Sequence, residues 1–578
     1  SVTTLLPTAA ERGGDFTGLT RTTSGWVPNA IAQRFNLSSS GTSNIFQQFN
    51  VVNGRLVPLA QTCTVNGVTT ATYCQFPGNR IPANMIDPKA LEILKFMPNA
   101  GDYFIDDAGL VRNYIVQRFV KQDETRYTLR LDHSITPNDN LNFRYTKTPA
   151  VGIRGFGSDV NGNSGIYSDA KQFLLAYNKM ITPTIVNDLR LNYTRGVFSE
   201  DFSPEFSIQG GRNLATELGL PSLTSGGLPL FQISGDSGNG YNAFADVGSS
   251  GSTNNFNVEQ RYNINDILYW THGNRTWKFG VDLSDARLSV IPFFGASGGR
   301  WEFRTVNTSD NRGTGLGNGG NNLASLLLGV PNVVQVRPLL INYDYRWKSA
   351  AAFVQQDWKV KPNLTLNLGL RYQLQYPRTE KHNLQGAFRP DLAQTVTLTD
   401  AQRRATATGL GVPTNQPIPA SVPTTVLIPP FAFAGRGGRS RYITPVDYLG
   451  FEPRFGFAWS PKLFKWAEEG SVVIRGGWGI SHATLTGNNR LPNPDFGAFT
   501  GVSTTATGST VGGTADTSQP VRLTGNPPFI SGGSIDATLG TNADGLVFLN
   551  SLGTPGFVIE PGGREKVPTS TNWNLSVQ

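Results

Sequence analysis

The segment NLTLNLGLRYQL, from Asn363 to Leu374, places an apolar residue at every second position. Its leucines and Tyr372 alternate with polar residues that include Thr365, Asn367 and Arg371. Side chains alternate between the two faces of a strand, so the segment predicts a strand with one apolar face and one polar face. A soluble sandwich buries such an apolar face in a core. A membrane barrel turns it toward lipid and turns the polar face toward a wet lumen.

The same alternation recurs in pairs of segments joined by short turns. In the first pair, RYTLRLDHSI at residues 126–135 is followed, after a turn containing Pro and Asn, by NLNFRYT at residues 140–146. Alternating runs separated by such turn residues predict antiparallel hairpins. Four further pairs occupy residues 173–181 with 187–195, 261–271 with 276–284, 347–360 with 363–374, and 454–460 with 471–481.

The connections between hairpins are much longer than the turns inside them. They occupy residues 148–171, 196–260, 285–345, 377–451 and 482–572. Loops longer than about 15 residues are uncommon in compact soluble domains. Outer-membrane barrels combine short turns at one end with long loops at the other. The sequence therefore predicts an all-β fold, a transmembrane antiparallel β-barrel with long extracellular loops.

Charged residues of the expected strands share a face with Thr, Asn and Gly, and not with Leu, Phe and Tyr. Four arginines follow this rule, namely Arg130, Arg144, Arg190 and Arg371. An arginine that faces lipid at the bilayer midplane costs about 2–4 kcal/mol, which gives the segregation a physical cause. We expect these four side chains to face the lumen.

Aromatic residues collect near the ends of the expected strands. Interfacial girdles place Trp and Tyr at such positions, although both residue types also favour strands in general. The girdle residues that we expect are Tyr269, Trp270, Trp277, Trp347, Trp358, Tyr376 and Trp459.

The first part of the chain lacks these strand pairs. One short helix is predicted there, with Asp87 as N-cap, Pro88 at its first position and Pro98 after its end. We expect residues 1–122 to form a long extracellular loop region with this one helix. Residues 123–578 are expected to form a partial transmembrane β-barrel that is truncated at the C-terminus.

The two cysteines, Cys63 and Cys74, lie close together in the polar segment CTVNGVTTATYC. A disulfide that closes a small loop in an oxidising compartment is one reading. Two free thiols are the other.

No motif predicts an enzyme. GLGNGG, from Gly315 to Gly320, matches GxGxxG but follows no apolar strand. The four histidines are scattered without metal-ligand spacing. The net charge of +8 forms no dense basic run, which argues against nucleic-acid binding. We therefore expect no catalytic residue, no cofactor and no metal site.

Several segments together resemble a known family. They include FVQQDWKVKPNLTLNLGLRYQ, GNRTWKFGVDL, FEPRFGFAWSP, NNLASLLLGVP and RIPANMIDPKALEILKFMPN. In this order they resemble TonB-dependent outer-membrane receptors, in particular the Oar-like group that carries a carboxypeptidase-regulatory-like domain. The resemblance implies a 22-stranded barrel, an N-terminal plug and a TonB box. The sequence shows no signal peptide, TonB box or plug, so we expect a barrel fragment that lacks the plug.

The resemblance implies a receptor and transporter in the outer membrane of a Gram-negative cell that takes up a large solute such as a peptide, glycan or chelate. Its partners would be outer-membrane lipid, an unknown extracellular ligand, and the TonB complex, which it would contact through a missing N-terminal segment. An alternative is an adhesin or structural surface protein anchored by the barrel. A soluble array of β-sandwiches is a third reading.

Fractionation separates the membrane readings from the soluble one. A barrel with a lipid-facing apolar surface is expected to be extracted only with detergent, and to change its migration on a gel when it is heated. The measurement is detergent fractionation followed by electrophoresis of heated and unheated samples. Recovery in the soluble fraction would contradict both membrane readings.

Overall fold

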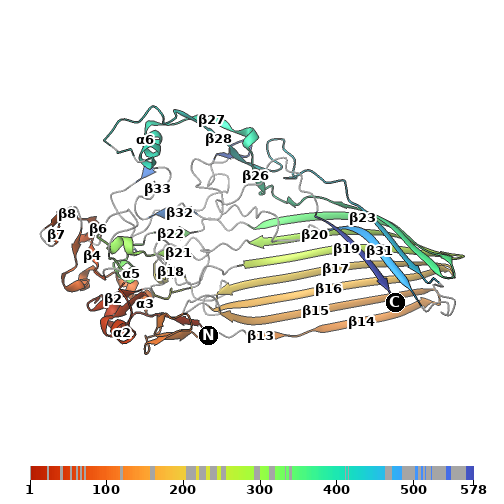
Figure 1. Cartoon of the computed structure of the whole chain (residues 1–578), viewed down its shortest axis with the longest axis horizontal. Helices are drawn as coiled ribbons and strands as arrows, with labels where there is room; N and C mark the ends of the chain where they lie inside the picture. The colour runs from red at the N-terminus through yellow and green to blue at the C-terminus, as the bar shows by residue number, and fades with distance from the viewer. Residues whose placement is uncertain are drawn as a thin grey trace.

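The computed structural model shows one large sheet with smaller elements at one of its ends (Figure 1). It describes residues 2–22, 25–39, 43–52, 55–59, 63–65, 68–70, 73–116, 121–155, 163–202, 217–219, 229–234, 244–248, 255–291, 300–310, 319–331, 333–336, 342–410, 412–413, 415–461, 472–483, 502–505, 510–511, 514–515, 523, 542–548 and 568–578.

Thirteen of the described strands form the large sheet, and every pair of neighbours in it is antiparallel. All five predicted hairpins are confirmed as neighbouring pairs, from β14 with β15 to β30 with β31. The strands are β13 (Lys121–Glu124), β14 (Tyr127–Thr136), β15 (Asp139–Gly155), β16 (Asn163–Thr182), β17 (Ile185–Phe202), β19 (Asn255–His272), β20 (Arg275–Ile291), β23 (Tyr343–Lys361), β24 (Leu364–Gln375), β25 (Thr379–Glu380), β30 (Phe451–Trp459), β31 (Ile474–His482) and β36 (Thr569–Val577).

Several strands are longer than the sequence predicted. β15 and β16 pair from Asp139 with Lys179 as far as Gly155 with Asn163, so most of the loop expected at residues 148–171 is strand. Where these strands extend beyond the predicted hairpins, polar residues fall on both faces, such as Lys147 and Thr148 on β15 and Ser168 and Asp169 on β16. The alternation that marked the membrane-facing part of each strand therefore stops before the strand does.

Two-residue turns join the strands at one end of the sheet, which we call the turn end. Three of them begin with a proline, at Pro137, Pro183 and Pro362, and each lies beside a register shift in its hairpin. Proline fixes φ near −65°, whereas the two-residue turns that match the twist of the flanking strands need a positive φ at their first residue. A bulge beside the turn accommodates this mismatch in the hairpin. The fourth turn begins with Gly273 at φ 61°, and its hairpin stays in register.

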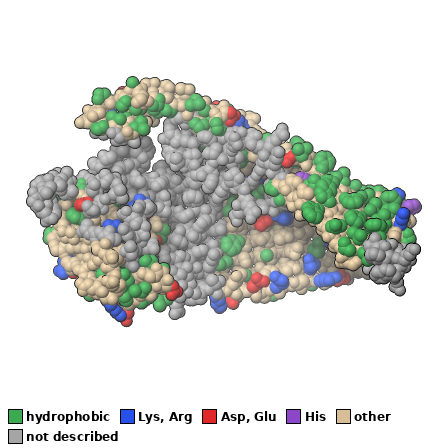
Figure 2. Space-filling view, in the orientation of Figure 1, with side chains coloured by type: hydrophobic (Ala, Val, Ile, Leu, Met, Phe, Trp, Pro, Cys, Tyr) green, Lys and Arg blue, Asp and Glu red, His purple; other side chains and the backbone are tan. Residues whose placement is uncertain are grey.

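The apolar face of the sheet is not covered by other parts of the described chain. Leu129, Val281 and Leu370 are 52%, 43% and 46% exposed on it. Figure 2 shows hydrophobic side chains over the β23–β36 side of the sheet and polar side chains over the visible face of β13–β17. The sheet thus curls so that its two faces are seen in one view.

The other end of the sheet, which we call the loop end, carries a packed cluster of side chains. Residues from the first hundred positions, including Phe16, Ile45 and Ile93, are buried there together with Phe231 and Trp301 from two long connections. The N-terminal elements lie beside this end in Figure 1. The cluster therefore joins segments that are far apart in the sequence.

The N-terminal region contains more helices than the single one that was predicted. Among its described residues are α1 (Ala9–Arg12), α2 (Asn29–Arg34) and α3 (Pro88–Leu94). α3 begins with Asp87 as N-cap, as predicted. The other two are too short to show an apolar period, although Thr8 and Glu11 form a capping box that the sequence contains.

The remaining described helices and strands are short and surround the loop end. They are β1 (Val2–Thr4), β2 (Leu19–Thr22), β3 (Gly25–Pro28), β4 (Phe46–Gln47), β5 (Phe49–Val52), β6 (Arg55–Pro58), β7 (Cys63–Val65), β8 (Val68–Thr70), β9 (Cys74–Gln75), β10 (Phe104–Ile105), β11 (Val111–Arg112), β12 (Tyr114–Val116), β18 (Leu230–Gln232), β21 (Arg300–Glu302), β22 (Val333–Val336), β26 (Gly386–Phe388), β27 (Gln394–Thr397), β28 (Thr425–Ile428), β29 (Pro430–Phe433), β32 (Val502–Thr505), β33 (Thr510–Val511), β34 (Thr514–Ala515), β35 (Leu546–Phe548), α5 (Asn322–Leu327), α6 (Asp400–Gly409) and the 3-10 turns η1 (Pro77–Asn79), η2 (Ala83–Met85), η3 (Thr305–Thr308) and η4 (Pro390–Leu392).

In the described part of the chain, no helix has both the length and the apolar character that a membrane span requires.

Backbone contact locks α3 against α5. The Asp87 amide donates to the Leu327 carbonyl at 2.7 Å. Gly329 follows α5 with φ 70°, and a Cβ atom there would lie 2.3 Å from the Asp87 carboxylate. Only glycine meets both demands at this position. The N-terminal region is thus tied to the connection between β20 and β23.

Glu11 is a titratable group buried in this cluster. Its side chain is 2% exposed. Burial raises the pKa of Glu11 to about 7, against hydrogen bonds from Thr8 that lower it. Burial, and then the charge of Glu11, raise the pKa of Tyr103 to about 12. The cluster is therefore more stable when Glu11 is protonated.

We expect Glu11→Gln to stabilise the N-terminal cluster above pH 7. Because folding raises the pKa of Glu11, the contribution of this residue to the stability of the folded protein is full below about pH 4.5 and is lost as the pH rises through 7. The gain at pH 8 is on the order of 3 kcal/mol, with little difference at pH 4.5. Pulse proteolysis in urea measures it, with Glu92→Gln, at an exposed side chain of α3, as control. A gain that is equal at both pH values would contradict the assignment.

Candidate functional site

The four predicted lumen arginines lie on one face of the large sheet. Arg130 pairs with Arg144 across β14 and β15. Arg190 lies in the same cross-strand row as Asp282 and Gln373, and Arg371 is two residues from Gln373. We call this the polar face. It lies opposite the exposed leucines and aromatic residues of the same strands.

Several cations on this face lie beside a carboxylate two residues away on the same strand. Arg130 Nε is 2.8 Å from Asp132, and Arg190 is 2.7 Å from Asp188. Lys278 on β20 instead reaches Asp357 on the neighbouring strand β23, at 3.2 Å. The polar face is therefore densely charged but nearly balanced in sign.

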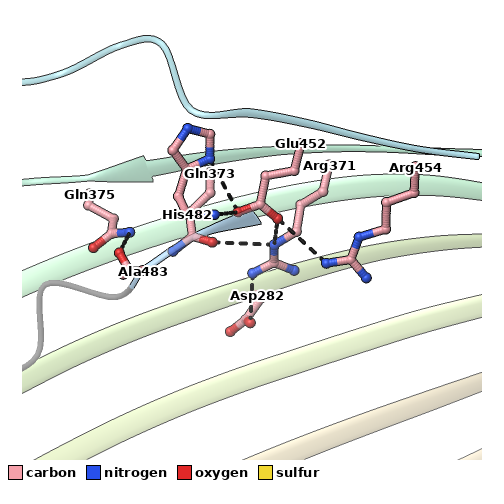
Figure 3. A network of polar contacts seen from close by, with 8 residues as sticks. All are labelled: Asp282, Arg371, Gln373, Gln375, Glu452, Arg454, His482 and Ala483. Carbon is pink, nitrogen blue, oxygen red and sulfur yellow. Dashed lines mark hydrogen bonds and ion pairs between the residues drawn. The ribbon is translucent and has the colours of Figure 1, made fainter. Parts of the chain in front are cut away.

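The most connected group on the polar face is the carboxylate of Glu452, on β30, shown in Figure 3. Its side chain is 3% exposed. It lies 3.8 Å from Arg371 Nε and 3.7 Å from Arg454. It also accepts a hydrogen bond from the His482 amide at 2.9 Å, and His482 Nδ1 lies 3.4 Å from it. One buried acid thus holds three strands together.

Arg371 extends this network across β23. Its guanidinium donates to Asp282 on β20 at 3.2 Å (Figure 3). Ala351 of β23 occupies the register position between Asp282 and Gln373. Its small side chain leaves room for the arginine to reach over the strand. The sequence placed Arg371 and Asp282 on the polar face but gave no sign of their contact with Glu452.

Two hollows accompany these charges. One, of about 280 Å³, lies on the polar face and is lined by Arg261, Asn265, Asp282, Ser284 and Arg371 among others. Its polar lining suits a hydrated solute. Among the described residues, no group of three His, Cys, Asp or Glu side chains is placed to hold a metal ion.

The larger hollow, of about 820 Å³, lies at the loop end, and we call it the loop-end pocket. Arg389, Asp391, Arg439 and Tyr442 line it. Arg439 donates to the carbonyls of Phe433 and Gly545 at 3.2 and 3.3 Å. Burial, and then the charge of Arg389, lower the pKa of Arg439. The volume lies in the range of sites that bind small ligands.

A protein-family model described as an outer membrane beta barrel domain matches residues 1–578. The chain belongs to this family. It is an outer-membrane protein, and the exposed apolar face of its sheet is the surface that lipid covers. In such barrels the short turns face the periplasm and the long loops face outward.

The solved structures similar to this chain include two receptors and a transporter. They are the ferric-catecholate import receptor Fiu of E. coli K12 (8% identity, TM-score 0.32), the copper transporter OprC (8%, 0.30) and the ferripyoverdine receptor of Pseudomonas aeruginosa (10%, 0.30). The matches cover 66%, 67% and 66% of this chain. The chain spans 46%, 40% and 40% of those structures. No curated protein matches it.

The predicted girdle residues divide between the two faces. Trp270, Trp277, Trp358 and Trp459 lie on the apolar face near the turn end, where Trp270 pairs with Trp277. Tyr269 and Trp347 fall on the polar face, since Tyr269 pairs with Lys278 and Trp347 with Ala286. Tyr376 stacks on Tyr442 of the loop-end pocket at 6.4 Å. The prediction of girdle residues used only their nearness to a strand end. The register of the strands determines which face of the sheet each residue lies on.

Sequence reasoning missed an aromatic row nearer the loop end. Tyr145, Phe173, Tyr193 and Tyr262 are cross-strand neighbours on the apolar face of β15, β16, β17 and β19. Their ring centroids are 4.6, 6.0 and 4.8 Å apart. A signal was present, because NFRYTK and RLNYTR both end an apolar run with Tyr, Thr and a cation.

Cys74 is disulfide-bonded. The side chain of Cys63 lies outside the described residues, and its pairing with Cys74 stays a prediction.

Replacing Glu452 tests the network in Figure 3. Glu452→Ala leaves Arg371 and Arg454 facing each other without their shared acid, so we expect a loss of about 2 kcal/mol in unfolding free energy. Urea unfolding in detergent, followed by tryptophan fluorescence, measures it. Asp132→Ala is the control, because that carboxylate is 57% exposed and its removal is expected to change little. Equal losses would contradict a central role for Glu452.

Proposed function

We propose that this protein is a receptor that captures a large solute at its extracellular loops and passes it through a polar lumen. The observation that carries the proposal is the placement of the loop-end pocket beside a sheet whose concave side is polar and charged. The family match supplies the outer-membrane setting. The Oar-like assignment and residues 1–122 as extracellular loop region are part of this proposal.

The pocket chemistry favours a solute that carries an acidic group. Arg389 is paired with Asp391, whereas Arg439 uses its donors on backbone carbonyls and keeps its full charge at the pocket wall. Tyr442 adds an aromatic surface with a hydroxyl group. A peptide carboxylate, an acidic glycan or an anionic chelate fits this lining.

Energy coupling through TonB belongs to the same proposal. It rests on the resemblance of several strand motifs to TonB-dependent receptors. The solved receptors and transporters named above are consistent with an import role. At this low similarity they give no information about the solute that this chain binds.

A surface adhesin is the second candidate. The packed cluster at the loop end favours it, because Phe16, Phe231 and Trp301 hold the N-terminal region and two connections in one fixed arrangement. A fixed outer surface suits binding to another surface. This role requires the barrel as an anchor and needs no passage of solute.

Uptake measurements separate the two functions. Cells that carry the protein are offered fluorescein-labelled acidic peptides, acidic oligosaccharides and ferric chelates, with and without functional TonB. We expect one class to enter the periplasm only with TonB, and Arg439→Gln to reduce entry about tenfold. Arg404→Gln, on α6 away from the pocket lining, serves as control. Surface retention that does not depend on TonB would establish the adhesin instead.

A further inference from the structure

Five cations lie in one cross-strand row on the apolar face of the sheet, at the loop-end border of its lipid-facing band. Lys147 pairs with Lys171, and Lys171 pairs with Arg195. Arg195 pairs with Gln260, Gln260 pairs with Arg287, and Arg287 pairs with Arg346. We call these five cations the cation row. It crosses β15, β16, β17, β19, β20 and β23 without a break in register.

The cation row runs directly beside the aromatic row. Each of its members on β15, β16 and β17 lies two residues from an aromatic ring on the same face, such as Lys147 from Tyr145 and Arg195 from Tyr193. The guanidinium carbon of Arg287 lies 5.0 Å from the centre of the Tyr262 ring. Aromatic belts mark the membrane interface, so the cations lie on its aqueous side.

The height of the row agrees with this placement. Lys147 follows the turn residue Asn138 by nine positions, and Arg195 follows Thr184 by eleven. At about 3.3 Å per residue and a tilt of about 40°, these spacings rise roughly 23 and 28 Å. The apolar band of an outer-membrane barrel is about 25 Å tall. The row therefore meets the headgroups of the outer leaflet.

The protein neutralises two of these five charges. Asp169 lies 3.2 Å from Lys171, and Asp285 lies 2.9 Å from Arg287. Lys147, Arg195 and Arg346 have no ion pair among the described residues. Like charges in neighbouring cross-strand positions repel each other. The charges of Lys147 and Arg195, on either side of Lys171, thus remain for a partner that comes from the membrane.

The opposite border differs. On the same face near the turn end, Lys179 lies 3.3 Å from Asp139, which also accepts a hydrogen bond from Tyr177. That cation is matched by the protein itself. Arg275, also on this face at the turn end, has no carboxylate partner among the described residues, but its guanidinium carbon lies 4.7 Å from the centre of the Trp358 ring.

We propose that the cation row binds phosphorylated lipid headgroups of the outer leaflet. Phosphate oxygens satisfy Lys and Arg donors through charge-assisted hydrogen bonds, and Arg engages them in pairs. The long stems of Lys147 and Arg195 lie along the apolar face while their charged ends reach the headgroup layer. The headgroup then takes the place of a carboxylate that the protein lacks there.

The test uses protein extracted from outer membranes and purified in detergent, titrated with diphosphorylated lipid A and followed by native mass spectrometry. At about fivefold per cation, K147Q/R195Q is expected to bind about 25-fold more weakly. The control is R144Q/R190Q, which removes two cations from the polar face of the same strands, β15 and β17, and is expected to bind like the original protein. Heat-dependent gel migration verifies folding, and the single variants K147Q and R195Q serve if the double variant does not fold.

Three results would overturn the proposal. The first is equal binding by K147Q/R195Q and the original protein. The second is equal binding of lipid A from which both phosphates have been removed. The third is displacement of the lipid by inorganic phosphate at the same concentration, which would identify a free-anion site.

Discussion

Lipid offers no hydrogen bonds, so each backbone N–H and C=O inside the membrane must find its partner on a neighbouring strand. The unbroken ladder from β14 to β36 meets this demand across the described sheet. Once the ladder is fixed, the two-residue period assigns every side chain to lipid or to the interior. The arginines of the polar face and the leucines opposite them follow from that one requirement.

The charged interior repeats a simple local solution. A cation and an acid two residues apart on one strand stand on the same face, as in Arg130 with Asp132 and Arg190 with Asp188. Glu452 repeats this solution with Arg454 and adds two partners from the neighbouring strands, Arg371 on β24 and the backbone amide of His482 on β31. Because Arg371 is its direct cross-strand partner, one carboxylate links three neighbouring strands.

Periodicity predicted the five hairpins, the polar-face arginines and the helix capped by Asp87, since each depends on neighbours close in sequence. It did not predict the long outer ends of β15 and β16, which lack alternation. It also assigned Trp347 to the girdle, although its register position faces the interior. The contacts of Glu452 with Arg371 and His482 join different strands, and the cluster that buries Phe16 and Trp301 joins residues from opposite ends of the first 300 positions, so no local pattern records them.

The cluster at the loop end also sets an order of assembly. It gathers side chains from the first hundred residues with Phe231, Trp301 and Leu327, whose connections start from β17 and β20. These segments share one place only after the strands between them have paired and their connections have reached the outer side. Contacts so distant in sequence form late. Until then the largest aromatic side chains of the cluster are exposed, so this chain needs protection from aggregation longest in the region that ends up farthest from the membrane.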